Sequence, residues 1–379
     1  MQNEVFTNAR IVTRDSIFNG TLTTAGTVVA EVDPGGTSAP AIDFDGDYLL
    51  PGLVELHTDN LEKHVTPRPG AVWPILPAVL AHDAQIAAAG ITTVFDAIAL
   101  GDVLPVSFRT ENMAPMIDGV DEASKAGLLR AEHYLHLRCE VCFQDLPSLV
   151  DELVERPIVR FASVMDHTPG QRQFVSMDKY AEYYQVKFNL TDAQFQTFVQ
   201  ERRDDQSKYA AAHRRYIVSL FRKKGIPIAS HDDAVAAHAD EAAEDGMVVA
   251  EFPTTIDAAE RSKQHGLGIM MGAPNLIRGG SHSGNVSAMD LARQDLVDII
   301  SSDYVPASLL PAAFKMAAEI EACTLAKAVQ TVTLQPAERV GLTDRGEIAA
   351  GKLADLIRVR ETKAGPAVVA VWKRGRRVL

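Results

Sequence analysis

The chain has 379 residues, of which 46% are hydrophobic and 23% charged, with 25 glycines and 19 prolines. This composition excludes a disordered or fibrous chain and predicts a packed core. Its 37 basic and 50 acidic residues give a formal net charge of −13. The acidic balance argues against sequence-independent binding to nucleic acid or anionic membrane, because clustered Lys and Arg supply that affinity. The acidic net charge is still compatible with a phosphorylated small-molecule substrate, since cations within one cleft can reverse the local electric field.

The chain has three cysteines, Cys139, Cys142 and Cys323. An odd, low number is typical of a reducing compartment and of proteins without a disulfide framework. The opening segment MQNEVFTNARIVTRD has no apolar core of the signal-peptide type. No run approaches the ~18 apolar residues of a membrane span. We therefore expect a soluble, cytoplasmic protein, and base rates suggest a homodimer.

The two ends of the chain predict short strands. The segments VFTNARIVTRD, GTLTTAGTVVAEV and AIDFDGDYLL are rich in β-branched residues and are separated by turn signals. The last residues, from Arg345 onward, return to the same pattern. We expect residues 1–50 and 345–379 to form one small β-sandwich domain.

Between these ends, strand-length apolar runs alternate with Ala-rich helical stretches. The strand candidates are residues 53–59, 92–98, 134–141, 158–167, 227–233, 247–253, 268–274 and 296–303. Eight βα units favour an α/β fold of the TIM-type (β/α)8 barrel over an open doubly wound sheet, so residues 51–344 are predicted to be a barrel. Residues 176–222 are polar and mostly helical in pattern, and we expect an insertion over one face.

Imidazoles and carboxylates stand at the ends of five of these strand candidates. A parallel barrel gathers its reactive groups there, and a divalent transition metal binds neutral imidazole nitrogen and anionic carboxylate oxygen. A single His at a strand end is more often a structural residue, but the repetition over five strands favours a metal site. The candidate ligands are His57, Asp59, Glu140, His167, His231 and Asp303.

Long sequence blocks carry a resemblance to a known family. GDYLLPGLVELH (46–57) and GEIAAGKLADL (346–356) resemble the opening and closing signatures of the amidohydrolase superfamily. Within it, HTDNLEKHVTPRP, HLRCEV, MDHTPGQ, SHDD, MGAPNLIRGGSHSGNVSA and SSDYVP are similar to the diphosphatase family of the carbon–phosphorus lyase pathway. This resemblance implies hydrolysis of α-D-ribose 1-methylphosphonate 5-triphosphate to the 5-phosphate and pyrophosphate, in phosphonate catabolism.

The chain departs from the wider superfamily in three respects. The usual His-x-His pair of the first strand is replaced by His57-Thr58-Asp59, and no lysine stands in an obvious bridging position, so we expect Glu140 to be the bridging carboxylate. His167 and His231 fall on the predicted fourth and fifth strands, whereas the superfamily usually places such ligands on the fifth and sixth. Either residues 176–222 hide a strand or the barrel is irregular.

Our mechanistic hypothesis uses two divalent ions, with zinc favoured and manganese or iron as alternatives. The metals would neutralise phosphoryl oxygens and lower the pKa of a bound water. The water or hydroxide that bridges the two ions would attack the α-phosphorus. Asp303 is the expected catalytic residue that takes the proton of the water. One ion would be held by His57, Asp59, Glu140 and Asp303, and the other by Glu140, His167 and His231.

A glycine-rich loop after the seventh predicted strand is a candidate anion-binding segment. Glycines allow close approach of the backbone to phosphate, hydroxyls and amides donate hydrogen bonds, and the following helix N-terminus adds partial positive charge. The alternative is a flexible loop with a capping residue. The candidate substrate-binding residues are Arg278, Ser281, His282, Ser283 and Asn285, with Arg68 and Arg172 as weaker candidates.

Two other functions remain possible. The same barrel and metals would suit an amidohydrolase acting on a cyclic amide or N-acyl substrate, and the donor-rich loop argues against it. A catalytically silent subunit of an assembly is disfavoured because every proposed ligand is present. Cys139-x-x-Cys142 lies in a predicted strand with its sulfurs on opposite faces, which favours packing over metal binding.

Overall fold

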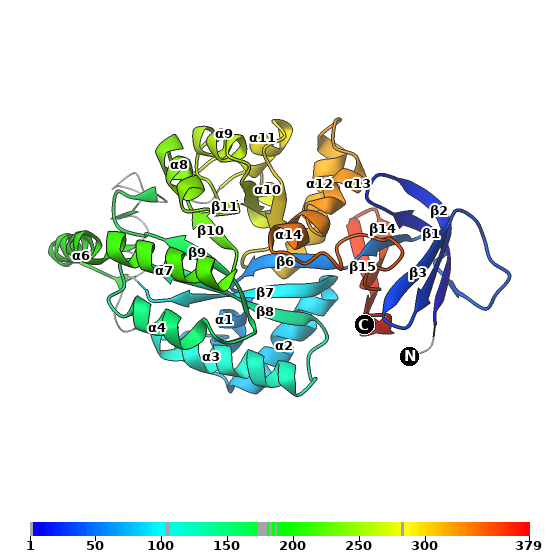
Figure 1. Cartoon of the computed structure of the whole chain (residues 1–379), viewed down its shortest axis with the longest axis horizontal. Helices are drawn as coiled ribbons and strands as arrows, with labels where there is room; N and C mark the ends of the chain where they lie inside the picture. The colour runs from blue at the N-terminus through cyan, green and yellow to red at the C-terminus, as the bar shows by residue number, and fades with distance from the viewer. Residues whose placement is uncertain (1–2, 103–106, 173–179, 182–183, 186–187, 282–283) are drawn as a thin grey trace.

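The computed structural model describes residues 3–102, 107–172, 180–181, 184–185, 188–281 and 284–379. They form a barrel of parallel strands with helices around it, and a second sheet beside it that contains both chain ends (Figure 1).

Eight parallel strands follow one another around the barrel in chain order. Their sequences are nearly continuous apolar runs, as expected for strands buried on both faces. Val54, Phe95, Phe161, Val249 and Met270 are among the side chains that fill the interior. All eight strand candidates, and the TIM-type fold class, are thereby confirmed. The strands are β6 (Leu53–Thr58), β7 (Ile91–Leu100), β8 (Glu132–Glu140), β9 (Val159–Met165), β10 (Ile228–His231), β11 (Val249–Glu251), β12 (Gly268–Gly272) and β13 (Ile299–Ser301).

The barrel closes between β13 and β6 through one bridge and several side-chain contacts. Thr58 pairs with Asp303 as an isolated parallel bridge. The buried Glu55 carboxylate accepts hydrogen bonds from the backbone amides of His57 and Ser302, at 2.7 and 2.6 Å. The Ser301 hydroxyl donates to the carbonyl of His57 at 2.7 Å. The seam therefore brings the segment after the last strand beside the end of the first.

Helices cover the outside of the barrel, and the chain returns through them from one strand to the next (Figure 1). They are α1 (Asn60–Val65), α2 (Ile75–Ala88), α3 (Phe108–Lys125), α4 (Leu146–Leu153), α7 (Ala211–Lys224), α8 (Ala236–Glu244), α9 (Ile256–Gln264), α10 (Ala273–Arg278), α11 (Ala288–Arg293), α12 (Leu309–Glu319), α13 (Leu325–Gln330) and α14 (Leu334–Arg339).

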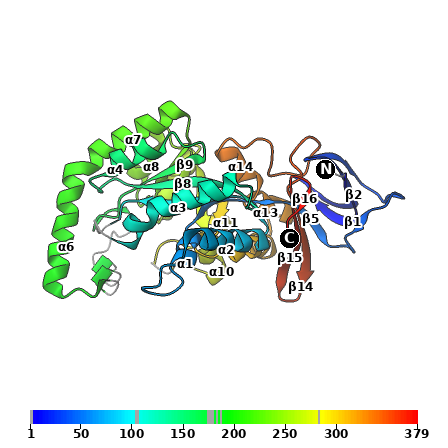
Figure 2. The same ribbon diagram turned by 90° about the horizontal axis from the view of Figure 1, so that it is seen from below.

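The predicted insertion at 176–222 contains two kinds of helix. Helix α6 (Asp192–Asp205) begins at a capping box of Thr191 with Gln194, and a π-helical turn, Gln206–Ala210, joins it to α7. Helix α7 packs on the barrel, whereas Figure 2 shows α6 at the end of the molecule away from the terminal sheet. Most of the described residues of this segment are helical, and none of them lies in a strand. His167 and His231 therefore do follow the fourth and fifth barrel strands.

The second sheet joins both ends of the chain. Its strand order is β16-β15-β14-β5-β1-β2-β3, and β4 pairs with β1. Phe6 of β1 and Trp372 of β15 are three strands apart in this order, yet their rings lie 5.0 Å apart. The sheet must therefore curve around a shared core, which places strands from the two ends face to face, as the sequence led us to expect. The strands are β1 (Val5–Val12), β2 (Ile17–Ala25), β3 (Val28–Asp33), β4 (Ile42–Asp43), β5 (Tyr48–Pro51), β14 (Leu356–Thr362), β15 (Gly365–Lys373) and β16 (Arg376–Arg377).

Within the described ranges, no helix is both long and apolar enough to span a bilayer.

Candidate metal centre

One buried carboxylate joins two of the predicted ligands. Glu251, the last residue of β11, places Oε1 2.6 Å from Nδ1 of His57 and Oε2 2.5 Å from Nδ1 of His231. All three side chains are at most 4% exposed. Because both Nδ1 atoms are used by Glu251, the Nε2 atom of each ring is the one that faces other groups. His57 Nε2 lies 4.0 Å from Oδ1 of Asp303.

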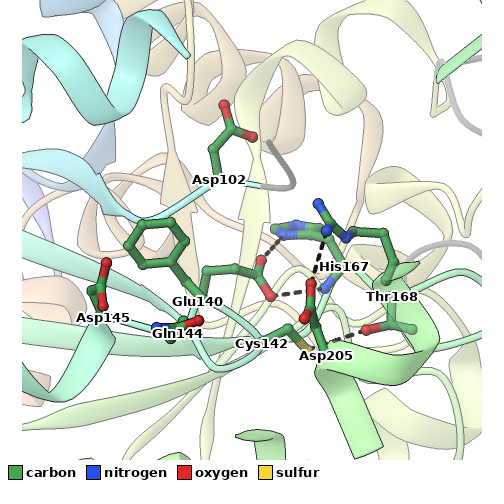
Figure 3. Close-up of a pocket in the computed structure, with 10 residues that line it drawn as sticks. Asp102, Glu140, Cys142, Gln144, Asp145, His167, Thr168 and Asp205 are labelled. Carbon is green, nitrogen blue, oxygen red and sulfur yellow. Dashed lines mark hydrogen bonds and ion pairs between the residues drawn. The ribbon is translucent and has the colours of Figure 1, made fainter. Parts of the chain in front are cut away.

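His167 is held in the same way by the carboxylate of another strand. Its Nδ1 lies 2.6 Å from Oε2 of Glu140, and Figure 3 shows the Glu140 carboxylate directed at the His167 ring. The backbone amide of His167 also donates to Oε1 of Glu140, at 3.4 Å. In this arrangement Glu140 orients His167, and the bridging role expected for Glu140 stays a prediction.

Two of the carboxylates follow a strand in a left-handed backbone conformation. The φ angle is 55° at Asp232, directly after β10, and 53° at Asp303, shortly after β13. Non-glycine residues adopt this conformation at an energetic cost, and such positions concentrate at functional sites. Burial raises the pKa of Asp303, and the neighbouring Asp59 carboxylate raises it further against the attraction of His57.

The donor atoms fit a bound cation. Asp59 Oδ1 is buried and makes no hydrogen bond within the described residues, whereas Asp232 Oδ2 lies 3.2 Å from Nε2 of His231. Buried carboxylate oxygens without a partner are costly unless a cation or water satisfies them. Burial by itself lowers the pKa of His231, but Asp232 and Glu251 outweigh it and raise the pKa to about 10. The electric field at this point therefore favours positive charge.

The predicted ligands fall into two neighbouring groups. His167, His231 and Asp232 each offer a ligand atom within 4.8 Å of the others. His57 and Asp59 lie against Asp303 at the barrel seam, where the Asp59 amide donates to the Asp303 carbonyl at 3.3 Å. This arrangement is compatible with two ion positions, one beside each group.

Sequence reasoning missed two residues of this cluster. Asp232 stands in the SHDD block but was not selected as a ligand, and Glu251 was not selected at all. Glu251 ends the sixth barrel strand, so the strand-end rule that found the other candidates would also have found it. Asp233, the residue after Asp232, is not a candidate ligand, because its carboxylate pairs with Arg172 and accepts from the Ser230 hydroxyl.

The glycine-rich loop lies beside this cluster. A pocket of about 110 Å³ is lined by Arg278, Ser281 and Asn285 on one side and by Asp232 and Asp303 on the other. His282 and Ser283 lie outside the described residues. The helix after the loop, α11, has only six residues. Its first amides are already bonded, since Ala288 donates to the Asn275 side chain and Asp290 to the Ser287 hydroxyl. Two of the first three amides of this helix are thus already used within the protein, and the contribution of the helix terminus to anion binding stays a prediction.

A second pocket is lined by Glu140 and His167 (Figure 3). It has a volume of about 290 Å³ and is also lined by Phe143, Arg202 and Asp205. Arg202 and Asp205 come from α6, so the insertion contributes to the lining of this pocket. Residues of the candidate centre thus line two pockets.

Two weaker candidates have structural roles. Arg172 is buried and pairs with Asp233 and Glu241, so its charge is used inside the protein. Burial raises the pKa of the Cys139 and Cys142 thiols. Neither thiol is activated, in agreement with the packing role favoured from the sequence.

Comparison with known proteins identifies relatives over the whole chain. Residues 211–378 match the amidohydrolase family. The chain is 46% identical over 376 residues to α-D-ribose 1-methylphosphonate 5-triphosphate diphosphatase from Escherichia coli strain K12, covering 99% of this chain and 100% of that protein.

Solved structures share the fold at low identity. N-acetyl-D-glucosamine-6-phosphate deacetylase from Mycobacterium smegmatis matches with a TM-score of 0.64 and 16% identity, over 100% of both chains. Dihydropyrimidinase from Brevibacillus agri matches with a TM-score of 0.59 and 13% identity, over 100% of this chain and 95% of that chain. These similarities support the barrel architecture.

Proposed function

Because this chain belongs to the amidohydrolase family, we propose that it is a metal-dependent hydrolase that cleaves α-D-ribose 1-methylphosphonate 5-triphosphate into the 5-phosphate and pyrophosphate. The observation that carries this proposal is the 46% identity to a diphosphatase of this specificity over the full length of both chains. The bond cleaved is a phosphoric anhydride, and the pathway is phosphonate catabolism.

The cluster at the barrel mouth supports a metal-dependent reaction. We assign His57, Asp59 and Asp303 to one ion, and His167, His231 and Asp232 to a second, with Glu140 and Glu251 holding the imidazoles. Divalent metals bound there would supply positive charge beside the phosphoryl oxygens and would acidify a water molecule. Mixed imidazole and carboxylate ligands suit zinc, and also manganese or iron.

The side chains of the site would transfer the proton and bind the phosphate groups. Asp303 accepts the proton of the attacking water, because a carboxylate beside the ion position, 4.0 Å from Nε2 of His57, can do so without leaving its place. Arg278, Ser281 and Asn285 contact phosphate oxygens from the adjoining pocket. His282 and Ser283 belong to the same loop and stay predictions. A cytoplasmic homodimer completes the proposal.

The proposal is tested on purified, metal-reconstituted protein. Pyrophosphate release is measured with α-D-ribose 1-methylphosphonate 5-triphosphate, and ammonia or amine release with a cyclic amide and an N-acyl sugar phosphate in parallel. We expect pyrophosphate from the triphosphate alone, lost after chelation and restored by divalent metal. Turnover of an amide without release of pyrophosphate would contradict the proposal.

A further inference from the structure

Glu251 occupies a place that the proposed function leaves unexplained. Its carboxylate is fully buried and binds the imidazoles of His57 and His231, which come from the first and fifth barrel strands. We propose that Glu251 is the positioning residue that fixes both imidazoles and thereby couples the two metal positions. This inference rests on the metal centre of the proposed function.

The two rings are arranged as a pair. They are nearly parallel, with an interplanar angle of 13° and centroids 6.3 Å apart. Each gives its Nδ1 to a different oxygen of Glu251, so the two Nε2 atoms face two different carboxylates. His57 Nε2 lies 4.0 Å from Asp303, and His231 Nε2 lies 3.2 Å from Asp232. One carboxylate therefore orients a donor atom toward each ion position.

The next residue along the chain holds the same two rings from another direction. The ring of Phe252 packs edge-on against His57, at 5.1 Å, and against His231, at 5.7 Å. Its backbone has a φ angle of 56°, a conformation that costs free energy for a residue with a side chain. Glu251 and Phe252 together therefore restrict both imidazoles.

The physical effect of Glu251 is on tautomer and geometry. A carboxylate that accepts from Nδ1–H leaves the lone pair on Nε2, which is the atom that binds a metal, and outer carboxylates of this kind raise ligand basicity. Because both imidazoles share one rigid, buried group, displacement of one ring displaces the carboxylate and then the other ring. An ion that orders the imidazole of His57 would thus also order the imidazole of His231 for the second ion.

A direct ligand role for Glu251 is the main alternative. Glu251, His57 and His136 also offer atoms within 4.8 Å of one another. However, both nitrogens of His136 are already bonded, to the Leu56 carbonyl at 3.0 Å and to the Ser163 hydroxyl at 2.9 Å. Both oxygens of Glu251 are likewise engaged, so this group has no donor set for an ion.

The test measures metal binding on the full-length apo-protein. Zn²⁺ is titrated in competition with a chromophoric chelator for the wild type, Glu251→Gln and Asp96→Asn. Loss of an outer carboxylate typically costs ten- to a hundredfold in metal affinity. The amide of Glu251→Gln accepts from one imidazole only, and because the two positions are coupled, we expect a loss of this size at both.

Asp96→Asn is the matched control. The Asp96 carboxylate also joins two buried imidazoles, those of His82 on α2 and His133 on β8, each at 2.7 Å, and neither ring is a proposed ligand. We expect its zinc affinity to equal that of the wild type. Wild-type affinity in Glu251→Gln, or a loss at one position only, would overturn the inference, as would an equal loss in the control.

A second measurement covers the case in which Glu251→Gln does not fold. Nitrogen-15 spectra of histidine-labelled wild-type protein loaded with Zn²⁺ report which ring nitrogen carries hydrogen. We expect Nδ1–H and a metal-bound Nε2 for His57 and His231, and Nε2–H on either ring would overturn the inference. Both readouts are independent of substrate, so failure to release pyrophosphate would reject the proposed function and leave this inference standing.

Discussion

The Glu55 carboxylate accepts a hydrogen bond from the backbone amide of Ser302, 247 residues further along the chain, at 2.6 Å. This contact closes the barrel where the regular ladder between the last and first strands is reduced to a single bridge. The same carboxylate accepts from the amide of His57. It therefore holds His57 on one side of the seam and, through Ser302, the adjacent Asp303 on the other.

Replacement of Glu55 by Ala should destabilise the fold. Two buried backbone amides would lose their acceptor, and each such loss costs about 1–3 kcal/mol. We expect the free energy of unfolding in urea to fall by about 2–5 kcal/mol, relative to the wild type. The control is Glu361→Ala, since Glu361 is 55% exposed and its ion pair with Arg10 spans 3.5 Å. A change of similar size in both variants would refute this view of the seam.

Asp303→Asn separates proton transfer from metal binding. The amide keeps the shape and one oxygen ligand of Asp303 but cannot take up a proton. We expect kcat for pyrophosphate release to fall by about 10²–10⁴-fold. The loss should persist at saturating metal, with metal content determined on the same sample. Full activity of the variant would remove Asp303 from the mechanism.

Arg278→Met tests the phosphate pocket. A charge-assisted hydrogen bond is worth about 1.5–3 kcal/mol, which corresponds to a KM raised by roughly ten- to a hundredfold. Because this bond is made equally to bound substrate and to the transition state, kcat should change little. Arg293→Met is the control, since Arg293 is 52% exposed on α11 and pairs with Asp290. An unchanged KM in Arg278→Met would exclude a phosphate contact.

A buried ion network on the outer side of the barrel wall makes the stability pH-dependent. His133 lies 2.7 Å from Asp96 and 3.3 Å from Asp83, with all three side chains inaccessible to solvent. Burial by itself lowers the pKa of His133, but the two carboxylates outweigh it and raise the pKa to about 9. The ordinary value in the unfolded chain is 6.5. The contribution of His133 is therefore complete below pH 6.5 and is lost as the pH rises through 9.

His133→Gln should remove this dependence. Breaking a buried ion pair leaves an unpaired charge, and we expect a loss on the order of 3 kcal/mol in the free energy of unfolding at pH 6. At pH 10 the difference from the wild type should be much smaller. The measurement is urea unfolding of both proteins between pH 6 and 10. Parallel stability curves over this range would show that His133 is uncharged in the folded protein.

The barrel could be predicted from sequence because its strands are uninterrupted apolar runs separated by helical segments. All eight runs became strands, from Leu53–Thr58 to Ile299–Ser301. The convergence of polar side chains at strand ends follows from the same topology, so His57, His231 and Asp303 could be selected as candidate ligands without knowledge of any contact. The association of strands from the two chain ends was also expected, since both ends carry the same strand-and-turn pattern, but the expectation was a β-sandwich and not one continuous curved sheet.

The partners of these ligands could not be predicted. Spacing shows that Glu140 and His167 end neighbouring strands, but not that one binds Nδ1 of the other instead of an ion. Glu251 ends a strand of only three residues, and its hydrogen bonds reach His57, 194 positions earlier. Such long-range pairing depends on strand register and side-chain rotamers, which no local pattern encodes.

The seam between β13 and β6 also determines when the centre is assembled. The backbone amide of Asp303 donates to the carbonyl of His57, at the end of β6. His57 is synthesised early, and Asp303 follows it about 250 residues later. A nascent chain that stops before Ser302 lacks both the amide that Glu55 binds and Asp303, a proposed ligand of the first ion position. A metal bound at the proposed position would therefore be acquired only after synthesis of nearly the whole chain, and truncated products would not retain it there.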